Sequence, residues 1–417
     1  LAGLLPEIRG NYLVFLPMVI PLTAAVFYRK TKEPKKTVLA TVLCLSAIAL
    51  VLLPFTIRNY KVSGKFALTT SQAGFNFYIG NNTGTNEPYF RPVSFAMPIP
   101  KLQPIHFAIE ASRRAGHRVT PDRSSRFWVK ETLRQAIQNP GKFSKRLVYK
   151  TLALINAFEA GDHYHIGFMA QFAPMFRLPL LSFGLLLPFG LTGILFTWKK
   201  SAAHRVLAGT ALLYGATVIL FFINTRYRLP LIVPFIPFAI AGIRYFVENL
   251  VNRKKIILYS GCVLILFLIE FLPLPGRGDM TAYYNTHGIL LNRKGDQKEA
   301  LEFWRKSSEQ QGAFSSFAEL SLAAQAIRKK DLQSALVILA RIPDDSFAAA
   351  AKYDMLGDIF LRQKKEEQAI TAYRRAVWIN SGQTKVWRKL LRLSRATGSE
   401  QAKKDLEMWR FVKSFYR

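Results

Sequence analysis

Long apolar runs separated by short basic segments organise the first two thirds of the chain. An α-helix needs roughly 20 mainly apolar residues to cross about 30 Å of hydrocarbon, because each residue advances it by about 1.5 Å. Six runs meet or approach this length, over residues 11–28, 37–55, 178–198, 205–223, 229–246 and 256–273. The pattern therefore predicts about six transmembrane helices.

The pattern changes after about residue 281, where alanine, charge and a 3.6-residue period replace the apolar runs. This period is typical of amphipathic helices that pack together in water. We therefore expect an all-α protein with a polytopic transmembrane helix bundle. Its predicted parts are two transmembrane helices (1–55), a loop domain (56–177), four transmembrane helices (178–273) and helical repeats (274–417).

Three short basic linkers set the expected orientation. They are RKTKEPKK at 29–36, KKSAAHR at 199–205 and NRKK at 252–255. Short loops rich in Lys and Arg stay in the cytoplasm, so the loop domain and the repeats are expected on the extracytoplasmic side. The sequence thus predicts a multi-pass protein of the cytoplasmic membrane, with a periplasmic loop domain and periplasmic repeats.

Composition agrees with a membrane protein and argues against a nucleic-acid binder. Among 417 residues, 50% are hydrophobic, yet 58 Lys and Arg stand against 26 Asp and Glu. The positive charge flanks the apolar runs and forms no nucleic-acid recognition motif, so nucleic acid is not an expected partner. The lipid bilayer is an expected partner, because a basic outer surface suits anionic headgroups or a phosphorylated lipid. Cys44 and Cys262 lie in apolar runs and form neither a disulfide framework nor a metal set.

The predicted loop domain has three sections. Residues 56–100 have no sustained helical period and are expected to be irregular with short extended pieces. Residues 104–137 are expected to be helical, with one face formed by Phe127, Val129, Leu133 and Ile137. Residues 142–158 form an amphipathic helix that is basic on its first turns. This helix either lies flat at the membrane interface or packs on the rest of the loop domain.

A polar cluster follows that helix. Its members are Asn156, Glu159, Asp162, His163 and His165. Such residue types can hold a divalent metal ion, but a polar cluster also commonly ends a helix and faces water. A divalent metal is therefore a possible cofactor, and no residue is assigned as its ligand.

A second notable segment is the short turn before the run at 229–246. Arg226, Tyr227 and Arg228 lie there at the mouth of two predicted spans. Arginines at a membrane interface often serve only as anchors. Two of them flanking a tyrosine can instead bind the oxygens of a phosphate, because a guanidinium donates two parallel hydrogen bonds.

The C-terminal part contains an internal repeat. The residues at equivalent spacing are Tyr284, Gly288, Leu291, Gly295, Ala300 and Trp304 in one copy, Leu322, Ala323, Ala326, Ala335 and Leu339 in a degenerate copy, and Tyr353, Leu356, Gly357, Phe360, Ala369, Tyr373 and Ala376 in a third. This spacing resembles that of tetratricopeptide repeats. It implies an α-solenoid of helical hairpins that binds a protein partner or acceptor.

The membrane part resembles the GT-C superfamily of glycosyltransferases, in particular its protein-mannosyltransferase-like and aminoarabinose-transferase-like members. The segments that carry the resemblance are Pro54 with Arg58-Asn59-Tyr60, the run from Thr70 to Asn82, Asn156-Ala157-Phe158-Glu159 and Arg226-Tyr227-Arg228-Leu229-Pro230. It covers residues 1–250, and bacterial members carry similar repeat tails. It implies transfer of a sugar from a polyprenyl-phosphate-linked donor to an extracytoplasmic acceptor, as in protein glycosylation of the cell envelope.

The resemblance also implies site residues. Arg58, Arg226 and Arg228 would hold the donor phosphate, and Tyr60, Asn81, Asn82 and Tyr227 would line the cavity. The acidic motif of the superfamily lies in its first extracytoplasmic loop and has no counterpart in this sequence. We therefore expect the chain to be truncated, with the catalytic carboxylates before Leu1, and we assign no catalytic base.

Two other functions fit the same pattern. An O-antigen polymerase or ligase also combines many spans with an arginine-rich outer loop. A membrane scaffold without catalytic activity would only display the helical repeats. An acidic motif upstream of Leu1 would favour the glycosyltransferase over the scaffold.

Overall fold

A computed structural model describes residues 12–13, 16–63, 73–161, 165–177, 183–310, 312–395 and 399–416. These residues form helices and connecting turns, with no strand among them, which confirms the all-α class. The chain divides into two compact units. Unit 1 comprises Leu1–Asn81, Asn139–Ala160 and Leu178–Leu274, and unit 2 comprises Asn82–Gln138, Gly161–Arg177 and Pro275–Arg417. The segment predicted as one loop domain contributes to both units.

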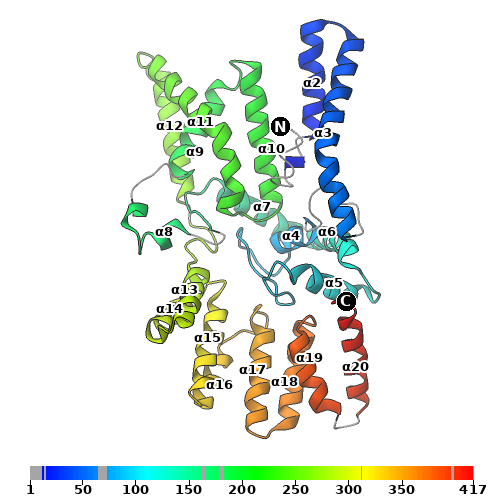
Figure 1. The fold of residues 1–417 in the computed structure, drawn as a ribbon. Helices are drawn as coiled ribbons and strands as arrows, with labels where there is room; N and C mark the ends of the chain where they lie inside the picture. Colours follow the sequence, from blue (N-terminus) through cyan, green and yellow to red (C-terminus); the bar gives the residue numbers. More distant parts are fainter. Residues whose placement is uncertain are drawn as a thin grey trace. The chain divides into compact units, whose positions relative to one another are not determined.

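Unit 1 contains the apolar helices (Figure 1). Its helices are α2 (Leu16–Thr31), α3 (Pro34–Ser63), α4 (Ala73–Asn81), α7 (Pro140–Leu154), α9 (Phe183–Thr197), α10 (Ala202–Leu220), α11 (Thr225–Glu248) and α12 (Arg253–Glu270). Among the described residues, three helices are long and apolar enough to cross a membrane, over Pro34–Lys61, Ala202–Leu220 and Thr225–Glu248. This finding indicates a membrane-associated protein.

The other predicted spans are shorter or carry more charge. α9 is apolar but has 15 residues, and residues 178–182 before it lie outside the described chain. α12 has 18 residues, of which the first three are basic and the last is Glu270. Three of the six expected spans are thus found by length and composition, and the number six stays a prediction.

Glycines let α9 and α11 pack backbone against backbone. A Cβ atom at Gly193 would lie 1.8 Å from the carbonyl oxygen of Phe238, and one at Gly242 would lie 3.0 Å from the Cα of Gly193. Helices in lipid have no hydrophobic driving force for association and depend on close van der Waals packing. Small residues at the crossing permit this packing. This close crossing makes α9 and α11 the central pair of unit 1.

The expectation of irregular chain over 56–100 is wrong in two places. α3 continues to Ser63, and Ala73–Asn81 forms the helix α4. α4 contains Gly74 and Gly80, which lowered its apparent helical propensity, but tertiary packing outweighs that propensity. A Cβ atom at Gly80 would lie 2.1 Å from the carbonyl oxygen of Phe221, so glycine is what allows α4 to rest against the end of α10.

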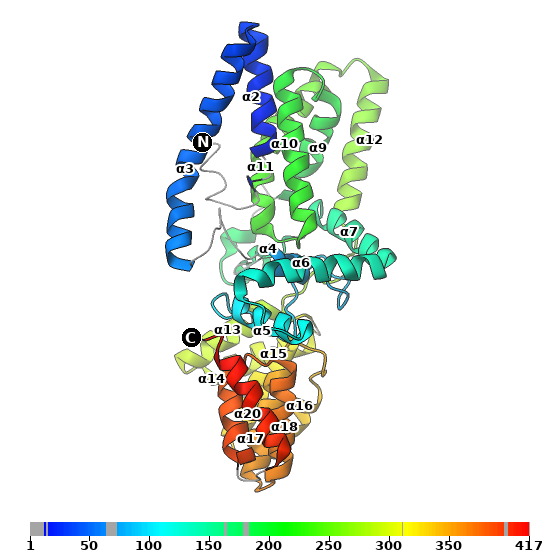
Figure 2. The same cartoon turned by 90° about the vertical axis from the view of Figure 1, so that its right-hand side faces the viewer.

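Unit 2 contains the helical hairpins and the remaining helices. These are α5 (Gln103–Ala115), α6 (Pro121–Gln138), α8 (Ile166–Met169), η2 (Pro174–Arg177), α13 (Thr281–Lys294), α14 (Gln297–Glu309), α15 (Ser315–Arg328), α16 (Leu332–Ala340), α17 (Ala349–Arg362), α18 (Glu366–Ile379), α19 (Thr384–Ser394) and α20 (Glu400–Lys413). Successive pairs from α13 to α20 pack as antiparallel hairpins, which follow one another in a row in Figure 1 and lie one behind another in the turned view of Figure 2.

The repeat residues occupy equivalent places in three hairpins. Ala300, Ala335 and Ala369 are fully buried. In the first hairpin, a Cβ atom at Gly288 would lie 2.6 Å from Nε1 of Trp304. In the third hairpin, a Cβ atom at Gly357 would lie 2.4 Å from the Tyr373 ring. A small residue on the first helix therefore faces a large ring on the second, which is the packing that the repeat spacing predicts.

The turns inside these hairpins repeat as well. Gly295, Lys330 and Lys364 all have positive φ, at 96°, 64° and 62°. In each turn the next residue donates its backbone N–H to the carbonyl five residues earlier, with N···O distances of 2.9–3.0 Å. This is a Schellman ending, which satisfies the last carbonyls of the first helix. Equal backbone geometry at spacings of 35 and 34 residues confirms the register of the three copies.

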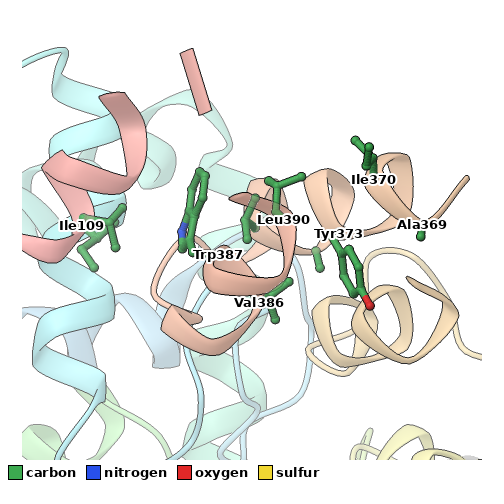
Figure 3. Close-up of a cluster of buried hydrophobic side chains, with 10 residues drawn as sticks. Ile109, Ala369, Ile370, Tyr373, Val386, Trp387 and Leu390 are labelled. Carbon is green, nitrogen blue, oxygen red and sulfur yellow. The ribbon is translucent and has the colours of Figure 1, made fainter. Parts of the chain in front are cut away.

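Helix α5 of the predicted loop domain packs against the last hairpins. Ile109 of α5 shares a core with Trp387 and Leu390 of α19 and Tyr373 of α18 (Figure 3). The Arg118 side chain, just after α5, lies over the Phe415 ring at 5.0 Å. The repeats and α5 thus share one hydrophobic core, an association that the sequence pattern did not predict.

The buried face of α6 differs from the predicted one. Ser124, Trp128 and Thr132 are buried, whereas Leu133 and Ile137 are exposed by 48% and 79%. The indole of Trp128 stacks on Phe95 and donates a hydrogen bond of 3.0 Å to the Phe107 carbonyl. Burial of this large ring, with its N–H hydrogen-bonded, decides which face of α6 packs inward.

His106 makes the α5 contact sensitive to acid. Its imidazole is buried against Gly382, and Nδ1 accepts a hydrogen bond from the Met97 N–H at 3.3 Å. Burial lowers the pKa of His106 to about 4 from 6.5. Between these values the unfolded chain binds a proton that the folded chain does not, so stability falls as the pH falls.

We predict that the free energy of unfolding decreases between pH 6.5 and pH 4 by up to about 1.4 kcal/mol per pH unit. His106→Phe should flatten this dependence, and His117→Phe, at an exposed position of unit 2, should leave it unchanged. Thermal unfolding of the detergent-solubilised protein across this range measures the slope. An equal slope in wild type and His106→Phe would contradict the assignment.

Candidate functional site

Two basic side chains of α7 point into unit 1. Arg146 and Lys150 have relative exposures of 1% and 0%. They lie on one helical face with the buried Ala153 and Leu154, at spacings of four, seven and eight residues from Arg146. Through this face α7 packs on α10 and α12. Arg146 and Lys150 are therefore buried in the unit that holds the apolar helices, whereas Lys142 and Lys145 near the start of α7 are exposed.

Asn81 at the end of α4 receives both basic groups. The Arg146 guanidinium donates to its backbone carbonyl, and Nζ of Lys150 donates to its Oδ1 at 2.8 Å. The Asn81 amide in turn donates to the carbonyls of Phe77 at 2.9 Å and Leu220 at 2.7 Å. Asn81 thereby joins α4, α7 and α10 at one point.

Two basic side chains meet a neutral amide at this point. Lys150 has no ion-pair partner among the described residues, and its Nζ donates a hydrogen bond to the neutral Asn81 amide oxygen. Burial, and secondarily the positive charge of Arg146, lower the pKa of Lys150 to about 7. A buried ammonium in this state is stabilised by any anion that comes near it.

Arg228 in the first turn of α11 is the third buried cation. Its Nη1 donates to the Asn156 carbonyl at 2.6 Å and its Nη2 to the Phe158 carbonyl at 2.8 Å. The guanidinium also lies 4.7 Å from the centroid of the Phe183 ring. The planar donor group thus holds the chain after α7 against α9 and α11, a contact that an ammonium could not make in the same geometry.

Glu270 at the end of α12 lies beside this arginine. Its carboxylate is 1% exposed, and neither oxygen has a hydrogen-bond donor among the described residues. The Arg228 guanidinium is close enough to act electrostatically on this carboxyl group, although neither carboxyl oxygen accepts a hydrogen bond from it. The Glu270 backbone carbonyl accepts from the Ala157 N–H at 3.0 Å, so α12 and the 156–158 segment are also joined here.

The residues predicted to hold the donor phosphate lie in different surroundings. Arg58 is exposed on α3, Arg226 is exposed at the start of α11, and Arg228 is buried. The Arg226 guanidinium lies 5.5 Å from the ring centroid of Tyr227. The structure thus places Arg226 and Arg228 within one helical turn, and the role of all three arginines stays a prediction.

The residues predicted to line a cavity also differ in exposure. Tyr60 on α3 is 58% exposed, Tyr227 and Asn82 are half-buried, and Asn81 is buried. Oδ1 of Asn82 accepts from the Gly84 N–H at 3.0 Å and so shapes the turn after α4. Their assignment to a cavity stays a prediction.

Sequence reasoning missed Arg146, Lys150 and Glu270. The helical period could have indicated Arg146 and Lys150. Lys150 lies one turn and Arg146 two turns before the apolar Ala153 and Leu154, on the same face of the helix. Glu270 carried no such signal, since an acidic residue at the end of an apolar run usually faces water. Its burial follows from the packing of α12 on α9.

The polar cluster after α7 serves the backbone. Asn156 donates from Nδ2 to the Leu272 carbonyl at 3.1 Å, and His165 accepts at Nδ1 from the Phe168 N–H at 3.2 Å. Asp162 and His163 lie outside the described residues. Among the residues that the structure describes, no group of three or more His, Cys, Asp or Glu side chains could hold a metal ion.

Comparison with known proteins identifies one region. A family profile described as a tetratricopeptide repeat-like domain matches residues 291–395. This match confirms the predicted repeats over that range and indicates a protein-binding role. No curated protein matches the chain. The resemblance of the membrane part to GT-C glycosyltransferases stays a prediction.

We predict a pH dependence that arises from Lys150. Between pH 7 and pH 10.5 the unfolded chain binds a proton that the folded chain does not, so stability should rise with pH by up to about 1.4 kcal/mol per unit. Lys150→Met should remove this rise, and Lys142→Met, at an exposed position of α7, should keep it. Thermal unfolding in detergent from pH 7 to pH 10 measures both. A rise of equal slope in Lys150→Met would contradict the burial of a charged amine.

Proposed function

We propose that this protein is part of a membrane glycosyltransferase, in which a sugar leaves a polyprenyl-phosphate-linked donor and the helical repeats bind a protein acceptor or partner. The observation that carries the proposal is the number of basic side chains buried in unit 1 around Asn81 and at the start of α11. Among the described residues of unit 1, the buried Lys, Arg, Asp and Glu side chains are three basic ones, Arg146, Lys150 and Arg228, and one acidic one, Glu270. A net positive charge in a weakly polarisable interior favours a phosphate nearby.

Exposed arginines at α11 and α3 are the proposed direct contacts. Arg226 lies two residues before Arg228, and its side chain reaches the surface. Arg58 is exposed in the last two turns of α3. In this proposal they bind the phosphate oxygens, while Arg228 positions the 156–158 segment through its carbonyl hydrogen bonds.

The chemistry that these cations would support is a displacement at the sugar carbon attached to the donor phosphate. The acceptor hydroxyl oxygen forms the new bond as its proton passes to a base. The carbon–oxygen bond to the phosphate breaks, and the bonding electrons leave with the polyprenyl phosphate. Fixed positive charge near the leaving oxygen stabilises the developing negative charge, which lowers the barrier. A bulk-water site would provide much less of this stabilisation.

The test is binding of a polyprenyl phosphate by the full chain in phosphatidylcholine nanodiscs. We expect the phosphate to bind at least tenfold more tightly than the matching polyprenol. Arg226→Ala and Arg58→Ala should each weaken phosphate binding about tenfold or more, a loss of about 1.4 kcal/mol. Arg205→Ala, an exposed arginine in the first turn of α10, is the matched control and should bind as wild type does.

Equal binding of the phosphate and the alcohol would overturn the proposal. Unchanged binding in both Arg58→Ala and Arg226→Ala would overturn the assigned contacts. Arg228→Ala is unsuitable as a test of binding alone, because it also removes the hydrogen bonds that hold the chain after α7.

A second candidate is a membrane scaffold that displays the repeats and has no catalytic activity. The match of residues 291–395 to a tetratricopeptide repeat-like domain favours it as much as the first. The scaffold would bind a protein but show no preference for the phosphorylated lipid, so the same binding experiment distinguishes the two.

A further inference from the structure

A hollow lies between α9, α11 and α12 in unit 1. It encloses about 350 Å³ and is lined by Phe189 of α9, Ile243 and Phe246 of α11, and Tyr259, Ser260, Val263, Leu264 and Phe267 of α12. The volume is at the lower end of those that hold small ligands. We call it the α11–α12 groove. Its lining is almost entirely apolar, so its occupant must present hydrocarbon.

The groove follows one face of α12 toward the basic end of that helix. Tyr259, Val263 and Phe267 recur every four residues, and the position one turn before Tyr259 is Lys255. Nζ of Lys255 donates to Oδ1 of Asn249, the residue that ends α11, at 3.0 Å. A lysine therefore stands between the ends of α11 and α12, at the head of the groove.

Further positive charge surrounds this head. Arg253 and Lys254 are exposed beside Lys255, and Lys199, Lys200 and Arg244 lie at the adjoining helix ends. The acidic group at this end is Glu248, which accepts from Nε of Arg244 at 2.6 Å and lies 3.9 Å from Nζ of Lys200. Six basic groups against one carboxylate leave a strong positive excess among the described residues.

We propose that the α11–α12 groove binds the acyl chain of an anionic phospholipid, whose phosphate lies on Lys255 and its basic neighbours. Charge complementarity selects this occupant. A zwitterionic lipid would offer the same hydrocarbon to the groove, but its own cation would offset the attraction of the basic groups. An apolar helix of a partner protein would fill the groove without using the lysine at its head. The proposal does not depend on the proposed sugar transfer.

The test counts lipids retained by the purified full chain in native mass spectrometry. Delipidated protein is titrated with phosphatidylglycerol or with phosphatidylcholine. We expect one phosphatidylglycerol to bind at least tenfold more tightly than phosphatidylcholine. Lys254→Gln with Lys255→Gln should abolish this preference, and Lys35→Gln, an exposed lysine of another basic linker, should keep it.

Filling the groove tests the acyl chain separately. Ser260→Trp should lower the affinity of the first phosphatidylglycerol at least tenfold, because the indole occupies the lined space. Ile257→Trp places the same side chain on an outward position of α12, which is 70% exposed, and should bind as wild type does. Circular dichroism and size-exclusion chromatography establish that the two variants are equally folded.

Three results would overturn the proposal. They are equal affinity for the two lipids, a preference that survives the double lysine change, and an identical effect of tryptophan at 257 and 260. A partner helix as the true occupant would give the last of these patterns, with lipid binding unaffected by either tryptophan.

Discussion

A buried guanidinium must satisfy its donors inside the protein, and this requirement organises one end of unit 1. The two terminal nitrogens of Arg228 do so with the carbonyls of Asn156 and Phe158. An arginine left without these acceptors would cost several kcal/mol, since water cannot reach it. The chain after α7 is therefore fixed to α11, and with it the face of α7 that carries Arg146 and Lys150.

The same constraint makes the part of unit 1 around Arg228 the best candidate for a phosphate-binding site. Positive groups that are buried for structural reasons leave a field that extends to the nearby surface, where Arg226 is exposed. At the other ends of α11 and α12 the charge is also positive, but it lies on exposed side chains around an apolar groove. One arrangement suits a phosphate held by a fixed scaffold, and the other suits a lipid that seats its chain between helices.

The sequence predicted the repeats well and the membrane part less completely. Ala300, Ala335 and Ala369 fixed the register of three hairpins because small residues recur wherever two helices approach closely. The runs that became α3, α10 and α11 were readable from length and hydropathy alone.

What the sequence could not show was set by contacts between distant segments. The helix α4 depends on the close approach of Gly80 to Phe221, and the face of α6 depends on the indole of Trp128. Asn81 and Arg228 were singled out as site residues. Lys150, which donates to Asn81, and Glu270, the acidic group on which Arg228 acts, lie 69 and 42 positions away from them along the chain. The hydrophobic pattern of a single segment cannot reveal contacts between residues that lie so far apart along the chain.

The central claim is that the Arg228 guanidinium and the Glu270 carboxyl group, both buried, interact inside unit 1. A double-mutant cycle of unfolding in detergent, with Arg228→Met, Glu270→Met and the double variant, measures this coupling directly. Each single change leaves the other group buried without its neighbour, whereas the double change removes both groups. We expect the double variant to be less destabilised than the sum of the single variants, by at least about 1 kcal/mol. Additive effects, within about 0.5 kcal/mol, would contradict the claim.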